Sequence, residues 1–329
     1  MDEVAVRPEA ADPTNEPAAQ RPNRRRTAIA VGFVLVVFVA AGVAVYRERH
    51  SFGDAVHRAG IWAMVLSFVV GTVGVALTFP VWREVLTGLG VRFPWGFGSR
   101  VFFTSQLGKY LPGSVWPVLI QMEAGRARGA SRRTMLAGNL LTIVLSCCVG
   151  LLVACAALPA WSPHALSHYW WVFLSLPFLL ALLHPRALPA LLDKAFAVLH
   201  RPPLHETLPA RSSLRASAWS LASWIVLGLH LYVLCAALGH GGLSSLALCV
   251  GGMALAVSAG VLFIPAPAGA GLREVVLVLV LRSVLTPGQA LAVVVGSRAL
   301  LILSDLLLAG LAGASRMIPT PARDAKVTR

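Results

Sequence analysis

The chain has 329 residues, of which 57% are hydrophobic and only 13% are charged, and its mean hydropathy is +0.74. Soluble domains carry about 25% charged residues, so this composition excludes a soluble protein and indicates a polytopic membrane protein. The net charge of +14 does not indicate a nucleic-acid partner, because the basic residues cluster in short segments between apolar runs. In such places they face anionic phospholipid headgroups and set the topology.

The N-terminal segment, residues 1–26, is rich in Ala, Pro, Glu and Arg and has no apolar periodicity, so we expect a disordered tail. It ends in RPNRRR, directly before the apolar run 27–46, which is long enough to span a bilayer. A signal peptide is the alternative interpretation, but no convincing small-residue cleavage site follows the run. We therefore expect an uncleaved first helix with the N-terminus in the cytoplasm.

Further apolar runs predict an all-α bundle of about seven or eight transmembrane helices, with broken or re-entrant segments, over residues 27–315. The predicted spans after the first are 61–80, 134–158, 169–184, 216–238, 243–264 and 289–313. The segment 272–285 is too short for a comfortable span, and is either a tilted short helix or a re-entrant one.

Basic residues in the connections predict the topology. The connection Arg83–Arg133 carries eight Lys or Arg and Arg186–Arg215 carries five, whereas the links 162–168 and 239–242 carry none. The positive-inside rule places the first two in the cytoplasm and the last two outside.

The tail 316–329 is basic and also fits the cytoplasm, which requires an even number of crossings. Seven clear spans give the wrong parity, so we count 272–285 as an eighth crossing. The predicted location is the cytoplasmic (inner) membrane.

The segment SQLGKYLPGSVW interrupts an apolar run with Gly108, Pro112 and Gly113. Broken backbone is stable in lipid only where protein or a water-filled cavity covers it, and transporters use such breaks to aim helix ends at substrates. Lys109 then offers a charge to an anion, with Tyr110 beside it. The alternative is an interfacial loop in which Lys109 reaches out to water.

A second break, FIPAPAGAGLREVV, lies in the other half of the chain. Arg273 and Glu274 follow it and begin a helix. Glu274 suits the positive end of the helix dipole, whereas Arg273 does not, which suggests a partner of opposite charge for Arg273. The alternative is an Arg–Glu anchor at the cytoplasmic surface. The residues that break the run are Pro265, Pro267, Gly269 and Gly271.

The last predicted span contains Arg298 and Asp305, seven residues apart on one helical face, with Ser297 and Ser304 beside them. An arginine at the centre of a span costs about 2.5–3.5 kcal/mol, so both charged residues should face the bundle interior. The alternative is a structural ion pair with another helix.

Other polar or reactive residues within spans have simpler interpretations. Asn139 and His230 predict contacts between helices. The five cysteines lie inside apolar runs without metal-ligand spacing, so we expect buried thiols and no metal or cofactor.

If Lys109, Arg273 and Arg298 meet Glu274 and Asp305 in one cavity, three basic residues face two acidic ones, and one positive charge is in excess. This excess suits a phosphate, the charged part of a lipid headgroup. The predicted substrate-binding residues are Lys109, Tyr110, Arg273, Glu274, Arg298 and Asp305.

The chain resembles a flippase-like membrane family related to the membrane half of bacterial lysylphosphatidylglycerol synthase. The resemblance rests on GKYLPGSVW, on the P-x-P-x-G-x-G-x-R-E run that ends at Glu274, and on Arg298. It implies an eight-helix bundle with re-entrant elements that moves an anionic or aminoacylated lipid, or a polyprenyl-linked sugar, between leaflets. We do not expect aminoacylation, because the chain has no room for the synthase's soluble transfer domain.

We do not expect an enzyme, because the sequence lacks the HExxH zinc-protease motif and the GxxxxGK[ST] phosphate-binding loop. The alternative to transport is a non-catalytic accessory subunit of a cell-envelope glycosyltransferase or lipid-modifying system. Its partner would then be an envelope-synthesis enzyme.

Overall fold

The computed structural model describes residues 49–111, 115–157, 159, 174–198, 208–262, 269 and 271–314. Every regular element in these residues is a helix, which confirms the predicted all-α bundle. Both tails and the expected first span, 27–46, lie outside the described residues. The elements are α2 (Arg49–Ala76), α3 (Thr78–Gly88), α4 (Trp95–Gln106), the 3₁₀ helix η2 (Leu107–Tyr110), α5 (Trp116–Arg126), α6 (Arg132–Ala157), α9 (Ser175–Leu182), α10 (Ala187–Val198), α11 (Ala210–Ala237), α12 (Leu243–Leu262), α13 (Leu272–Leu281) and α14 (Pro287–Ala314).

Five helices in the described part of the chain are long and apolar enough to cross a membrane, so the protein is a multi-pass membrane protein. Each of them overlaps one predicted span, and α2 and α3 form one of the five together. The described part of the predicted span 169–184 contains the eight-residue helix α9. The five are His57–Gly88, Arg132–Ala157, Ala210–Ala237, Leu243–Val261 and Pro287–Ala314.

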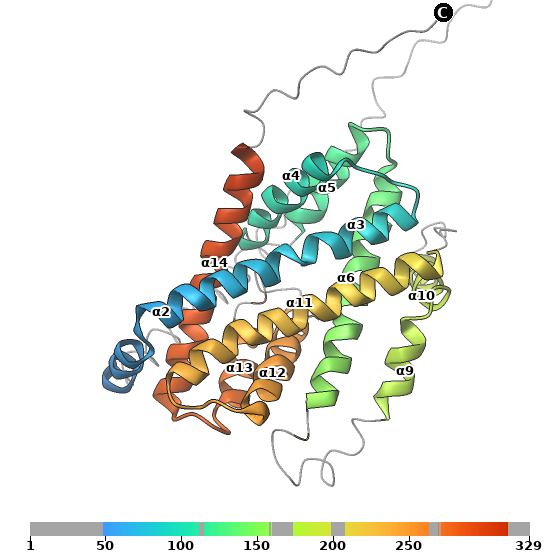
Figure 1. Cartoon of the computed structure of the whole chain (residues 1–329). Helices are drawn as coiled ribbons and strands as arrows, with labels where there is room; N and C mark the ends of the chain where they lie inside the picture. Colours follow the sequence, from blue (N-terminus) through green and yellow to red (C-terminus); the bar gives the residue numbers. More distant parts are fainter. Residues whose placement is uncertain are drawn as a thin grey trace, which may run out of the picture.

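Helices α2, α11 and α14 pack together as a central group, in which α2 runs alongside α11 (Figure 1). Small residues allow the close approach, as is usual where no hydrophobic effect drives helices together in lipid. A Cβ atom at Gly71 of α2 would lie 2.8 Å from Nδ1 of His230 on α11. At Gly228 of α11 it would lie 2.3 Å from the Cα of Val250 on α12, so α12 joins this group closely.

Two helical hairpins lie against this group. The first hairpin comprises α4, η2 and α5, and its two arms are joined by a buried hydrogen bond from Gln121 Nε2 to Ser105 Oγ of 2.8 Å. The second hairpin comprises α12 and α13. A Cβ atom at Gly252 of α12 would touch Val280 of α13 at 2.7 Å, and one at Gly260 would touch Arg273 at 3.2 Å. The later residue of α12 thus contacts the earlier residue of α13, so α12 and α13 are antiparallel.

The segment 272–285, which we expected as an eighth crossing, is not among the helices of the described residues that are long and apolar enough to cross a membrane. Helix α13 has 10 residues and rises about 15 Å, half of the hydrocarbon thickness, so it does not cross a bilayer by itself. It folds back along α12 instead, which is the re-entrant alternative.

The two hairpins approach α14 from its opposite ends (Figure 1). Near the C-terminal end of α14, Arg100 of α4 donates from Nε to the carbonyl oxygen of Ala312, 3.4 Å away. The chain then runs inward along α4 to η2. At the other end, five residues separate the end of α13 at Leu281 from the start of α14 at Pro287. The tips of both hairpins therefore lie beside the middle of α14.

Candidate functional site

The centre of α14 carries two ionisable residues, Arg298 and Asp305. Arg298 lies 11 residues after the start of the helix and Asp305 lies 9 residues before its end. At 1.5 Å per residue, these positions are about 16 Å and about 14 Å from the respective helix ends, so both charges lie deep in the span. An unpaired charge at this depth is costly, so each residue needs a partner from another element.

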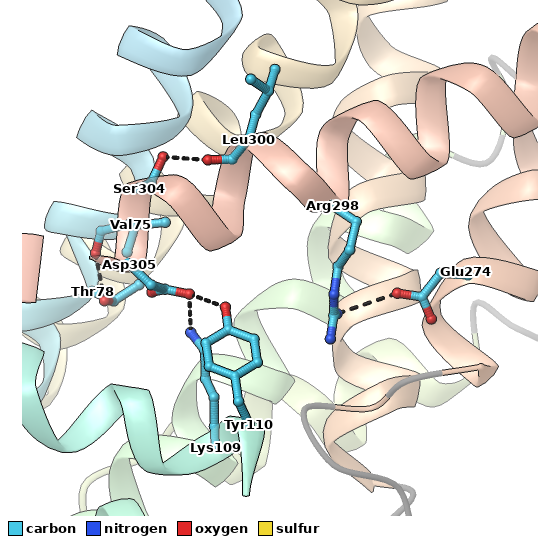
Figure 2. A network of polar contacts seen from close by, with 9 residues as sticks. All are labelled: Val75, Thr78, Lys109, Tyr110, Glu274, Arg298, Leu300, Ser304 and Asp305. Carbon is cyan, nitrogen blue, oxygen red and sulfur yellow. Dashed lines mark hydrogen bonds and ion pairs between the residues drawn. The ribbon is translucent and has the colours of Figure 1, made fainter. Parts of the chain in front are cut away.

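The tip of the first hairpin supplies two partners for Asp305 (Figure 2). Lys109 Nζ lies 2.7 Å from Asp305 Oδ2, and the hydroxyl group of Tyr110 donates a hydrogen bond to the same oxygen. The tight 3₁₀ turn of η2 brings these consecutive side chains to one carboxylate. The side chain of Asp305 is 4% exposed and that of Lys109 is 30% exposed. Lys109 is therefore bound to a buried acid, unlike a lysine of an interfacial loop that reaches only water.

The tip of the second hairpin supplies the partner for Arg298. Arg298 Nη1 lies 3.2 Å from Glu274 Oε1, and both side chains are partly buried (Figure 2). The other carboxylate oxygen of Glu274 accepts a hydrogen bond of 2.7 Å from the backbone N–H of Gly271. Gly271 has a φ of 92°, which a residue with a side chain rarely adopts. Glu274 thus caps the start of α13 and binds α14 at once.

Arg273 differs from the other two basic residues because it makes no ion pair in the described part of the chain. It interacts electrostatically with Arg298, Glu274, Tyr110 and Asp305, so it lies within the same group of charges. Its Nη2 atom lies 3.7 Å from the thioether sulfur of Met253, a weak acceptor. We expected a partner of opposite charge for Arg273, but the neighbouring Glu274 pairs with Arg298. Arg273 therefore carries the excess positive charge of the group.

Two of the predicted helix-breaking glycines allow close contacts at the hairpin tips. A Cβ atom at Gly108 would lie 2.9 Å from the Cβ of Trp116, so a side chain there would push the arms of the first hairpin apart. Gly269 has a φ of 67°, and a Cβ atom on it would lie 2.7 Å from the Cα of Gly260. The remaining predicted breakers, Pro112, Gly113, Pro265 and Pro267, lie outside the described residues.

The serines beside Arg298 and Asp305 bind the central helices. His230 donates from Nδ1 to the carbonyl oxygen of Ser67, and its Nε2 atom lies 2.9 Å from Ser297 Oγ. Ser304 Oγ lies 2.9 Å from Thr72 Oγ1. Sequence reasoning anticipated a helix contact for His230 but missed Ser67 and Thr72. In the sequence, Ser67 and Thr72 are marked only by a hydroxyl group inside an apolar span, and many residues share that feature.

The other polar residues in the spans have structural roles. Asn139 accepts a hydrogen bond of 3.2 Å from Trp82 Nε1 and so joins α6 to α3. All five cysteines are buried free thiols. Within the described residues, no group of three His, Cys, Asp or Glu side chains is placed to hold a metal ion. The charged group around α14 is therefore the candidate site.

Comparison with known proteins places the chain in a family. A family model described as the lysylphosphatidylglycerol synthase TM region matches residues 26–309. The chain belongs to this family. The match includes both hairpins and all six residues of the candidate site, and it points to a function connected with membrane lipids. No curated protein matches the chain.

Proposed function

We propose that the protein moves an anionic membrane lipid, or a lipid-linked glycan, between the leaflets of the cytoplasmic membrane without catalysing a reaction. The observation that carries this proposal is the excess positive charge of Arg273, beside two hairpin tips at the middle of α14. The family supports a lipid as the substrate, because its name refers to the membrane region of a lipid-modifying synthase.

Arg273 is suited to a phosphate because of its chemistry and its neighbours. A guanidinium group can donate two parallel hydrogen bonds to phosphate oxygens. Lys109 and Arg298 are already neutralised by Asp305 and Glu274, at 2.7 Å and 3.2 Å. A headgroup that reaches the tips would therefore meet one uncompensated cation.

The opposite approach of the two hairpins supports a route across the membrane. The first hairpin lies toward the C-terminal end of α14, and the second lies toward its N-terminal end (Figure 1). Release of one tip from α14 would open the site toward one leaflet, and release of the other tip would open it toward the second leaflet. The headgroup would cross between the tips while its acyl chains stay in lipid, as alternating access requires.

The test is leaflet exchange in vesicles that contain the purified full-length protein. The probe is fluorescent phosphatidylglycerol, with fluorescent phosphatidylcholine as the zwitterionic comparison. We expect exchange of the anionic lipid to exceed that of protein-free vesicles. Arg273→Gln should lower its rate about tenfold or more, because it removes a charge-assisted contact with the phosphate.

Arg282→Gln is the matched control, because Arg282 is an exposed arginine directly after α13 and its loss changes the net charge equally. It should exchange lipid at the rate of the unmodified protein. Equal rates for Arg273→Gln and the unmodified protein, at equal reconstitution, would remove Arg273 from the mechanism. The absence of exchange by the unmodified protein with any anionic lipid or lipid-linked glycan would favour the accessory-subunit hypothesis.

A further inference from the structure

The start of the first hairpin packs on a cluster of aromatic rings far from the candidate site. Phe79, Trp82 and Phe102 form its buried part, with ring centroids 5.4–6.2 Å apart. The ring of Trp95, in the first turn of α4, lies against Phe79 at 5.6 Å. Phe97 follows two residues later and packs on a neighbouring ring of the cluster. The first turn of α4 therefore presents two rings that buried neighbours hold in place.

An arginine lies on each of these rings. The guanidinium carbon of Arg83 is 4.2 Å from the centroid of Trp95, and that of Arg128 is 4.1 Å from the centroid of Phe97. Stacking occupies the face of a guanidinium group and leaves its N–H groups directed outward in the plane. Arg83 Nε is buried and lacks a hydrogen-bond partner in the structure. We call Arg83, Trp95, Arg128 and Phe97 the arginine collar.

The carboxylates nearest in sequence do not neutralise the collar. Glu84 lies 4.0 Å from Arg215, and Glu123 lies 2.7 Å from Arg132. Neither Arg83 nor Arg128 makes an ion pair within the part of the chain that the structure describes. The collar therefore keeps two positive charges in fixed positions.

The place of the collar in the fold indicates a bilayer surface. Helix α4 begins at the collar, near the C-terminal end of α14, where a 28-residue span finishes. The side chain of Trp95 is 57% exposed, and tryptophan is enriched at the level of the lipid headgroups. Cationic groups and an exposed tryptophan at this level fit the phosphate and the adjoining glycerol region of a phospholipid.

We propose that the arginine collar binds headgroups of anionic phospholipids in the leaflet at the C-terminal end of α14. This surface is distinct from the group of charges around Arg273, and the proposal does not depend on transport. The lipid would neutralise Arg83 and Arg128 and hold the start of the first hairpin at the membrane surface.

Thermal unfolding of the full-length protein in detergent tests the proposal. The probes are short-chain phosphatidylglycerol, short-chain phosphatidylcholine and inorganic phosphate, titrated separately at physiological salt. We expect phosphatidylglycerol alone to raise the unfolding midpoint in a saturable way. Arg83→Gln with Arg128→Gln should weaken its apparent affinity by about fivefold for each arginine removed.

Arg186→Gln with Arg211→Gln is the matched control, because both are exposed arginines expected on the same side and the pair loses equal charge. The control keeps both stacked arginines of the collar, so it should bind as the unmodified protein does. An equal loss in both pairs would reduce the effect to general surface charge and overturn the proposal. Equal stabilisation by phosphatidylcholine or by inorganic phosphate would overturn it as well. If the variant with Arg83→Gln and Arg128→Gln unfolds too readily, a variant with Arg83→Lys and Arg128→Lys takes its place. This variant should bind phosphatidylglycerol more weakly than the unmodified protein, because lysine cannot form the planar stack.

Discussion

The two hairpins contact the same helix with opposite charge. In the first hairpin the tip supplies the cation, Lys109, and α14 supplies the anion, Asp305. In the second the tip supplies the anion, Glu274, and α14 supplies the cation, Arg298. Both tips thus bind the centre of α14, yet neither can replace the other, because each would meet a like charge at its neighbour's position.

The two contacts also differ in burial and in what supports them. Asp305 is 4% exposed and has two partners from η2, one of them the 30% exposed Lys109, whereas Arg298 and Glu274 are 19% and 28% exposed. A buried acid depends strongly on its cation, because water cannot compensate for a lost partner. A pair that solvent partly reaches is weaker. We therefore expect the first hairpin to be the more tightly held.

The largest effect should follow Lys109→Glu. This change places a second carboxylate beside the buried Asp305, and we expect it to lower the free energy of unfolding by about 3 kcal/mol. Titration with SDS, followed by circular dichroism, measures this loss. Adding Asp305→Lys to the variant exchanges the charges and should restore most of the stability. If the exchanged pair is no more stable than Lys109→Glu alone, Lys109 and Asp305 do not form the main contact of the first hairpin.

A smaller effect should follow Glu274→Gln. The amide oxygen can still accept the hydrogen bond from Gly271, but the charge that binds Arg298 is lost. We expect a loss of about 1.5 kcal/mol in the same titration, because a hydrogen bond between charged groups becomes a weaker one. Glu274→Ala removes the cap as well and should cost more. A loss larger than that of Lys109→Glu would reverse the ranking of the two hairpins.

The smallest effect at the site should follow Tyr110→Phe. The ring remains, and only the hydrogen bond to Asp305 is removed, so we expect a loss of about 1 kcal/mol. Glu123→Gln is the control, because its ion pair with Arg132 is more than half exposed and should contribute about 0.5 kcal/mol or less. If the two variants unfold at the same SDS fraction, the tyrosine hydroxyl adds nothing to the first hairpin.

The sequence alone was sufficient to predict the apolar spans and the two places where Gly and Pro interrupt them. Apolar runs about 20 residues long located the five helices of the described residues that are long and apolar enough to cross a membrane. The interrupted runs around Lys109 and Arg273 located both hairpin tips, because Gly and Pro disturb helices in a recognisable way. The seven-residue spacing of Arg298 and Asp305 placed them on one helix.

The pairing of the charges was beyond sequence reasoning. Three cations and two acids allow several arrangements, and we expected an acidic partner for Arg273 without being able to name it. In the structure Glu274 binds Arg298, and Asp305 binds Lys109, 196 residues away in the chain. Long-range packing decides such pairs, and no local pattern encodes it. The length of α13 was equally hard to judge, because an apolar run of 14 residues is ambiguous between a short crossing and a folded-back arm.

The double role of Glu274 has a mechanical consequence. A single carboxylate closes the first turn of α13 and fastens that turn to the neighbouring helix, through separate oxygens. A rotation of the Glu274 carboxylate toward Arg298 weakens its hydrogen bond with Gly271, and the reverse rotation weakens the ion pair. Detachment of the second hairpin from α14 and fraying of the first turn of α13 should therefore occur together. Helix α13 would then unwind progressively from its first turn, rather than move away from α14 as a rigid body.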